Sequence, residues 1–247
     1  MANIEIYIHI PFCVRKCGYC DFLSAPGTEE QREAYVQALI REIGSAMSPA
    51  RLLTVARAAE RTGLEQESLE QTARGLLRAL EDSEVSSVYI GGGTPSILTG
   101  EQIWRIMTAV KKTFRMADDC EITMEVNPAT VDIQKLSRCR FAGINRVSIG
   151  LQSADDKDLA MLGRVHTVED FEETFRMVRE AGFKNVSVDL IHSLPGQTVE
   201  SWEKSLRFVA HLGPEHISAY SLIIEEGTPF YNKYFYNLKK HIESLNY

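Results

Sequence analysis

The sequence has few of the features that mark membrane, secreted or nucleic-acid-binding proteins. Its 247 residues contain no apolar run near the roughly 18 residues that a membrane-spanning helix needs. Lys and Arg number 27 against 34 Asp and Glu, and the net charge of −7 argues against an extended nucleic-acid-binding surface. The N-terminal residues lack the basic start and long apolar stretch of a secretory signal. We therefore expect a cytoplasmic protein that has no membrane-spanning segment and binds no nucleic acid.

Cysteine is also scarce, and an odd total of five argues against a disulfide framework. Three of the five, Cys13, Cys17 and Cys20, follow an apolar run with the spacing C-x3-C-x2-C. A closed zinc site would need a fourth ligand, whereas a [4Fe–4S] cluster held by three cysteines keeps one iron open. A structural zinc site and three unrelated thiols are the alternatives. We expect Cys120 and Cys139 to be small buried hydrophobes.

The apolar pattern predicts six strands that alternate with helices. Residues 4–10, for example, alternate isoleucine with Glu5, Tyr7 and His9, as a strand does. Such alternation predicts a parallel α/β sheet with right-handed crossovers. Six repeats are too few for a closed eight-stranded barrel, so an open partial barrel and a doubly wound sheet both fit. The predicted strands are 4–10, 85–90, 121–126, 146–151, 186–191 and 216–222, and the predicted helices are 29–46, 100–115, 132–142, 168–181 and 199–211.

Two segments fall outside this repeat. Residues 47–83 are rich in Ala, Leu, Glu and Arg, and they predict an inserted helical segment that Gly63 and Gly75 break into short helices. Residues 231–247 place aromatic and aliphatic side chains at helical spacing. We therefore expect a core domain over residues 1–230 and a helical tail over 231–247.

Polar side chains and glycines follow the predicted strands where each strand ends. In barrels of this kind the carboxyl ends of the strands build the active site. Three glycines at 91–93 end the second strand, and glycine lets a ligand approach the backbone closely. Glu125, Gln152 and Asp189 lie in or at the ends of three later strands. Taken singly, each carboxylate could cap a strand, Arg164 could be a surface charge, and His9 could be a hydrogen-bonded core histidine.

These motifs resemble the radical S-adenosylmethionine (SAM) superfamily, and more closely its oxygen-independent coproporphyrinogen oxidase group, which includes heme chaperones of the HemW type. The resemblance covers nearly the whole chain to about residue 230, apart from the helical insertion. The ordered motifs that carry it are 7–13 (YIHIPFC), 90–96 (IGGGTPS), 125–128 (EVNP), 148–153 (SIGLQS), 189–191 (DLI) and 194–198 (LPGQT).

The resemblance implies an open, partial (β/α)6 barrel with a [4Fe–4S] cluster on Cys13, Cys17 and Cys20. It also implies that the cluster's open iron binds SAM and that a reductant of the flavodoxin or ferredoxin type supplies electrons. The residues that the resemblance assigns to SAM are Tyr7, Tyr19, Gly92, Gly93, Thr94, Glu125, Gln152, Arg164, Asp189 and Ile223.

Two departures separate the branches of this group. The oxidases carry a fourth cysteine two residues after the third, where this chain has Phe22. That difference resembles the HemW branch, whose members bind heme and pass it to an acceptor protein. Family members continue into a further domain with a His-Asn-x-x-Tyr motif, which this chain lacks.

We therefore expect a heme chaperone, while the choice between enzyme and carrier stays open. A coproporphyrinogen III oxidase of porphyrin biosynthesis is the first alternative. A core that holds cluster and SAM without a heme function is the second.

Overall fold

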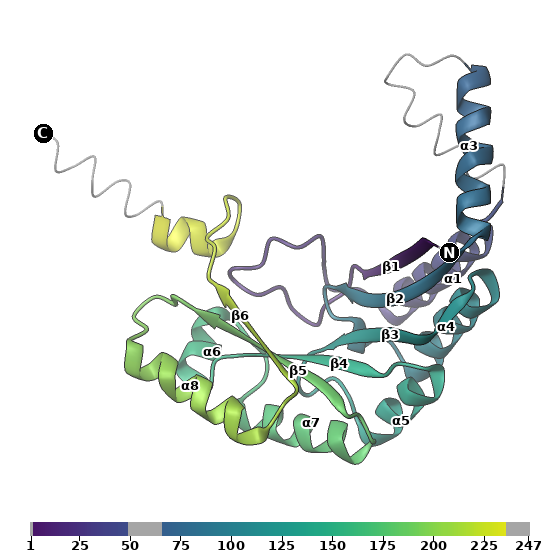
Figure 1. The fold of residues 1–247 in the computed structure, drawn as a ribbon. Helices are drawn as coiled ribbons and strands as arrows, with labels where there is room; N and C mark the ends of the chain where they lie inside the picture. The colour runs from purple at the N-terminus through teal and green to yellow at the C-terminus, as the bar shows by residue number, and fades with distance from the viewer. Residues whose placement is uncertain (1, 49–65, 236–247) are drawn as a thin grey trace, which may run out of the picture.

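The computed structural model describes residues 2–48 and 66–235, and it places six parallel strands in one curled sheet (Figure 1). Each strand pairs with the next along the chain, in the order β1 to β6. This arrangement confirms the predicted α/β partial barrel and excludes the doubly wound alternative, whose strand order reverses. The strands are β1 (Ala2–Ile10), β2 (Ser83–Gly92), β3 (Met116–Val126), β4 (Arg146–Gln152), β5 (Asn185–His192) and β6 (His216–Ser221).

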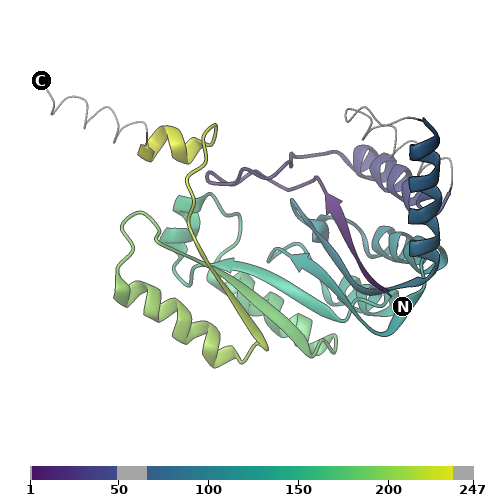
Figure 2. The same ribbon diagram turned by 45° about the horizontal axis from the view of Figure 1, so that its top comes forward.

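Helices cover the outer face of the sheet, and the segments after β1 and β6 approach each other across its open side (Figure 2). The helices are α1 (Glu29–Ser45), α3 (Gln66–Glu81), α4 (Gly100–Thr113), α5 (Ile133–Ala142), α6 (Asp156–Leu162), α7 (Val168–Glu180) and α8 (Val199–Leu212), with short turns η2 (Pro95–Ile97) and η3 (Tyr231–Phe235). Among the described residues, no helix has both the length and the apolar character that crossing a bilayer requires.

Strand alternation gives the sheet an apolar outer face and a polar inner face. Ile90, Met124 and Val188 are buried under the helices. Their neighbours Glu125 and Asp189 point to the opposite side, because successive strand residues face opposite ways. The main core therefore lies outside the sheet, and the inner face forms a polar lumen.

Local signals explain why most helix boundaries lie within two residues of the predicted ones. Thr99, Thr167 and Thr198 begin α4, α7 and α8 with capping boxes, in which side chain and backbone at the helix start bond reciprocally. Gly143 and Gly213 end α5 and α8 in the left-handed conformation that favours glycine.

Three predictions at the margins of the fold have different outcomes. The prediction that Gly75 breaks a helix is wrong, because α3 runs through it and stands out from the sheet (Figure 1). Gly63 and residues 236–247 lie outside the described residues. The short helix α6 was not predicted, since its seven residues give too little periodicity to detect.

Phe171 tests the core between the sheet and its outer helices. Its fully buried ring packs against Phe175 and Phe208, at centroid distances of 6.1 and 6.2 Å. We expect Phe171→Ala to lower the free energy of unfolding by about 3–5 kcal/mol, as deletion of a buried ring does. Phe141→Ala removes a ring that is 73% exposed and is the matched control. Equal losses in urea titrations of the two variants would contradict this placement of the core.

Candidate functional site

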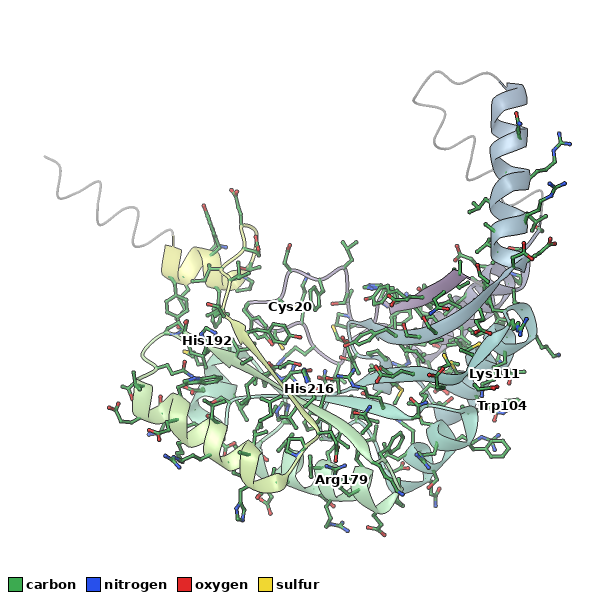
Figure 3. All side chains as sticks on the ribbon, viewed as in Figure 1. Cys20, Trp104, Lys111, Arg179, His192 and His216 are labelled. Atoms are coloured by element: carbon green, nitrogen blue, oxygen red, sulfur yellow. The ribbon has the colours of Figure 1, made fainter. Side chains whose placement is uncertain are left out.

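The three clustered cysteines lie on the loop that follows β1, at the open side of the sheet (Figure 3 labels Cys20). All three are free thiols, and Cys13 is buried. The loop is shaped by backbone bonds from Cys13 N to Ala25 O (3.2 Å) and from Cys20 N to Cys17 O (3.2 Å). Burial raises the pKa of the Cys20 thiol, and the nearby Cys17 and Cys13 thiols raise it further. Cys20 therefore lies close enough to the other two thiols for their charges to act on it.

The turn between α6 and α7 holds this thiol loop (residues 11–25) in place. Gly18 N donates to Leu162 O at 3.1 Å. The Arg15 guanidinium donates to Gly163 O at 2.9 Å and to Arg164 O at 3.2 Å. The turn itself is fixed by Gly163, which is left-handed at φ 77°. Contacts across about 150 residues of sequence thus join the loop to the backbone of Arg164.

The Arg164 side chain connects the thiol loop with the strand ends. Its Nη2 donates to Asn127 Oδ1 and to Gly150 O, both at 2.9 Å, and its Nη1 lies 3.8 Å from Cys17 Sγ. Asn127 Nδ2 in turn donates to the buried Thr94 Oγ1 at 2.8 Å. The Arg164 Nε is buried without a partner, so one donor of this cation is free for a ligand. Arg164 is therefore not the surface charge that the sequence left open.

Tyr19 and Phe230 form a second contact between the thiol loop and a segment that is distant in the sequence. Phe230 N donates to Gly18 O at 3.0 Å, and the two rings meet edge to face at 6.2 Å. Phe230 belongs to a small separate core with Leu162, with Ile191 near the end of β5 and with Leu194 just after it. Burial raises the pKa of Tyr19, although the Arg164 charge acts in the opposite direction.

Two half-buried carboxylates lie in the lumen below this loop. Glu125 accepts hydrogen bonds from Tyr89 Oη at 2.9 Å and from Gly92 N at 3.2 Å. Asp189 accepts from Ser148 Oγ at 3.1 and 3.0 Å. Burial raises the pKa of both carboxyls, and the Asp189 charge adds to the rise at Glu125. The lumen therefore offers two acceptors whose ionisation responds to any charged ligand.

The glycine motif at 91–93 also has a packing role within the protein, which the sequence did not reveal. A Cβ on Gly92, which is left-handed at φ 118°, would lie 2.9 Å from Ile10 O. A Cβ on Gly93 would lie 2.5 Å from Phe12 O. The sequence assigned these glycines to a ligand, and the structure adds that they let β2 lie against the start of the thiol loop.

The remaining predicted residues lie around the rim of the lumen. Tyr7 is exposed, and its hydroxyl is hydrogen-bonded to His9 Nδ1 at 3.1 Å. His9 also bonds Leu23 O at 3.0 Å, so it is satisfied as predicted, but in the lumen rather than the core. Gln152 is left-handed at φ 77°, with its amide beside Gly150. Ile223 follows β6 and is 67% exposed, and it takes no part in the contacts described for the other predicted site residues.

Sequence reasoning missed four residues that organise the site, namely Tyr89, Asn127, Arg15 and Phe230. Tyr89 and Asn127 had usable signals, because Tyr89 lies two positions before Gly91 on the inward face of β2 and Asn127 lies in the 125–128 motif at the end of β3. The partners of Arg15 and Phe230 are remote in sequence, and no local pattern identifies them.

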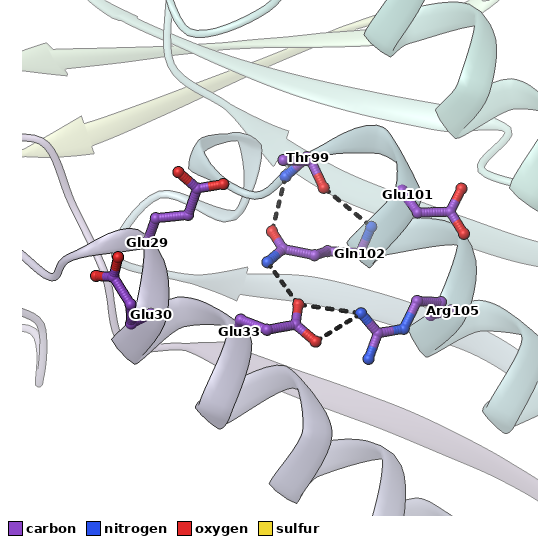
Figure 4. A pocket seen from close by; sticks show the side chains of 7 residues that line it. All are labelled: Glu29, Glu30, Glu33, Thr99, Glu101, Gln102 and Arg105. Atoms are coloured by element: carbon purple, nitrogen blue, oxygen red, sulfur yellow. Dashed lines mark hydrogen bonds and ion pairs between the residues drawn. The ribbon is translucent and has the colours of Figure 1, made fainter.

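A surface hollow between two helix starts does not mark this site. It measures about 410 Å³ and lies between the starts of α1 and α4, where Glu33 accepts bonds from Gln102 and Arg105 (Figure 4). Those bonds lower the pKa of Glu33 to about 2. A hollow of about 20 Å³ beside Cys17 and Arg164 is far smaller. The smaller hollow belongs to the site, because it brings the Cys17 thiol, the Arg164 guanidinium and the Thr94 side of the glycine motif together.

The thiol set fits a multi-iron cluster in ligand type and number. Among the residues the structure describes, no three His, Cys, Asp or Glu side chains converge as a single metal ion would require. A [4Fe–4S] cluster instead takes each thiolate on a different iron, so its ligands need not meet at one point. The free Arg164 Nε beside Cys17 adds a donor suited to an anionic ligand.

Residues 7–209 match the Radical SAM superfamily. This chain belongs to that superfamily. Its members use a [4Fe–4S] cluster and SAM. The family and the partial barrel predicted from the motifs are thereby confirmed.

Individual relatives agree with the closer resemblance. The heme chaperones HemW of Haemophilus influenzae and Escherichia coli are each 34% identical to this chain over 93% of its length, which covers 54% and 53% of those proteins. The structure of coproporphyrinogen III oxidase (HemN) from Escherichia coli is similar at a TM-score of 0.69 and 27% identity, over 98% of this chain and 52% of that one. The chain thus spans about half the length of the relatives it matches.

Gly93 tests the close approach of β2 to the thiol loop. We expect Gly93→Ala to lower the free energy of unfolding by about 1–3 kcal/mol, because the added methyl must displace the Phe12 backbone. The buried Cys13 thiol should then react faster with an alkylating reagent, measured by mass spectrometry. Gly44→Ala in α1, where a Cβ meets nothing within 4 Å, is the control and should stabilise by about 0.5–1 kcal/mol. An unchanged Cys13 rate in Gly93→Ala would contradict the contact.

His166 tests the buried side of the α6–α7 turn. Its Nε2 lies 3.3 Å from Leu151 O and its Nδ1 has no partner. Burial lowers the pKa of His166 to about 4, and the Arg164 charge adds to this. The native pKa is below the unfolded value of about 6.5, so the neutral ring stabilises fully above pH 6.5 and less as the pH falls towards 4.

We expect this effect to cost about 2 kcal/mol of stability between pH 7 and pH 5, as the unfolded histidine binds its proton first. In His166→Gln that part of the pH dependence should disappear from the urea unfolding curves. His211→Gln changes an exposed histidine and is the control. Parallel pH profiles for wild type and His166→Gln would show that the ring is not buried neutral.

Proposed function

We propose that this chain is the radical-SAM part of a HemW-type protein that binds heme and passes it on. The observation that carries the proposal is the apolar surface directly after Cys20. Phe22 is 64% exposed and Leu23 is 85% exposed, where the oxidase branch has a fourth cysteine. Exposed apolar side chains at the mouth of the lumen suit a flat, apolar ligand. The 34% identity to HemW proteins supports the same assignment.

In this proposal Cys13, Cys17 and Cys20 hold the cluster as thiolates. The Arg164 guanidinium faces the SAM carboxylate, and Glu125 and Asp189 accept bonds from its polar groups. When bound, the cluster supplies an electron to SAM. The other residues proposed to line the SAM site are Tyr7, Tyr19, Gly92, Gly93, Thr94, Gln152 and Ile223.

The proposed partners are a reductant and a heme acceptor protein in the cytoplasm. Arg15, Lys16 and Val14 are exposed on the thiol loop, so a basic and apolar surface lies between Cys13 and Cys17. That surface suits an acidic electron donor of the flavodoxin or ferredoxin type. The acceptor is a protein whose chemistry the proposal leaves unspecified.

A coproporphyrinogen III oxidase is the second candidate, favoured by the structural similarity to HemN. The exposed Phe22 in place of a fourth cysteine counts against it. A core that holds cluster and SAM without heme is the third candidate, because the thiols and the Arg164 donor fit these two groups without reference to heme.

A heme titration of the anaerobically reconstituted protein separates these candidates. We expect saturable heme binding, read by visible absorption with and without SAM, and no decarboxylation of coproporphyrinogen III. The Cys13→Ala/Cys17→Ala/Cys20→Ala variant is the control, and it should lose its iron and its visible charge-transfer absorption. Decarboxylated product would support the oxidase, and an intact cluster without heme binding would support the third candidate. Retained iron in the triple variant would overturn the cluster assignment.

A further inference from the structure

Tyr89 of β2 contacts two of the residues proposed to bind SAM. Its hydroxyl donates to Glu125 Oε1 at 2.9 Å. Its ring stacks on that of Tyr7, with centroids 6.2 Å apart and planes 22° from parallel. The strand pairing explains this geometry, because Tyr7 lies directly opposite Tyr89 in the β1–β2 ladder. One side chain therefore supports a carboxylate on β3 and an aromatic ring on β1.

The space around this contact is closed on the side of the glycine motif. A Cβ on Gly91 would lie 2.9 Å from the Tyr89 ring and 3.1 Å from Glu125 Oε1. Gly92 N fixes the other carboxylate oxygen at 3.2 Å. The Glu125 carboxylate is thus held at both oxygens, and Gly91 has no side chain because Tyr89 and Glu125 occupy that volume.

The charges around Glu125 make the Tyr89 hydroxyl important. Asp189 faces the carboxylate from β5 and disfavours its charge, while His9 faces it from β1 and favours it. Burial raises the pKa of Tyr89, so the phenol remains a hydrogen-bond donor. Of the side chains that face Glu125, Tyr89 is a neutral donor that both satisfies the carboxylate and fixes its direction.

We propose that Tyr89 is a positioning residue for the SAM site, which orients the Glu125 carboxylate through its hydroxyl and supports the Tyr7 ring by stacking. This inference rests on the proposed function, in which Glu125 and Tyr7 contact SAM. Tyr89 acts through these two residues. Tyr89→Phe keeps the ring that stacks on Tyr7 and removes only the hydroxyl, so the role of the hydroxyl can be tested by itself.

The experiment measures SAM affinity by equilibrium dialysis on reconstituted protein, with iron content and visible absorption recorded for every sample. We expect Tyr89→Phe to weaken SAM binding about tenfold while the cluster stays complete, because an unsupported carboxylate binds its ligand less well. Tyr35→Phe also removes one phenolic hydroxyl, which donates to His9 O, and it should leave the affinity unchanged.

Two further readouts separate positioning from packing. Adding Tyr89→Phe to Glu125→Gln should weaken binding no further, because the hydroxyl acts through that carboxylate. In Tyr89→Phe alone, the pH midpoint of SAM binding should move upward, since a lost donor raises the pKa of Glu125. Additive losses, an unmoved midpoint or unchanged affinity in Tyr89→Phe would each overturn the inference.

The proposed function fails in a different way. If wild-type protein carries a full cluster and binds no SAM, the proposed function is overturned and the role of Tyr89 with it. If wild type binds SAM and Tyr89→Phe binds it equally well, only the role of Tyr89 is overturned.

Discussion

The site depends on one contact, the Arg164 side chain between the thiol loop and the strand ends. Its Nη2 donates to Asn127 Oδ1 and Gly150 O, while its Nη1 lies beside Cys17. Removing a guanidinium from water is costly unless its donors are satisfied, so these acceptors fix where the side chain lies. The Arg15 bonds to the same turn fix its backbone. A loop without regular structure is thereby held over the lumen.

The lumen below that loop follows from the division of polar and apolar residues between the two faces of the sheet. Helices cover the outer face, so the core is complete without filling the inner face. The inner face can therefore keep Glu125 and Asp189, each held by hydroxyl or backbone donors. Buried carboxylates without such donors would destabilise the fold. The stability of the protein and the polarity of its site thus come from opposite faces of the same strands.

The thiol loop also depends on chain that comes much later in the sequence. Phe230 closes against Gly18 and Tyr19, and it belongs to a small core that is separate from the main one. A small core of this kind stabilises less than the main core, because it buries less apolar area. A large ligand that binds at the mouth of the lumen therefore disturbs the packing of the main core less than one that binds elsewhere.

The sequence by itself determined the strands, most of the helices and the group of three thiols. These features are local, because alternation, caps and the spacing of Cys13, Cys17 and Cys20 are all read within a few residues. Only the tertiary structure decided that Arg164 is partly buried beside Cys17, that Gly93 makes room for Phe12, and that Tyr89 holds Glu125. Each of these contacts joins residues from different strands or loops, and local sequence carries no information about which partner a side chain meets. The prediction that Gly75 ends a helix was wrong for a related reason, since a glycine costs only about 1 kcal/mol in a helix and the rest of α3 outweighs it.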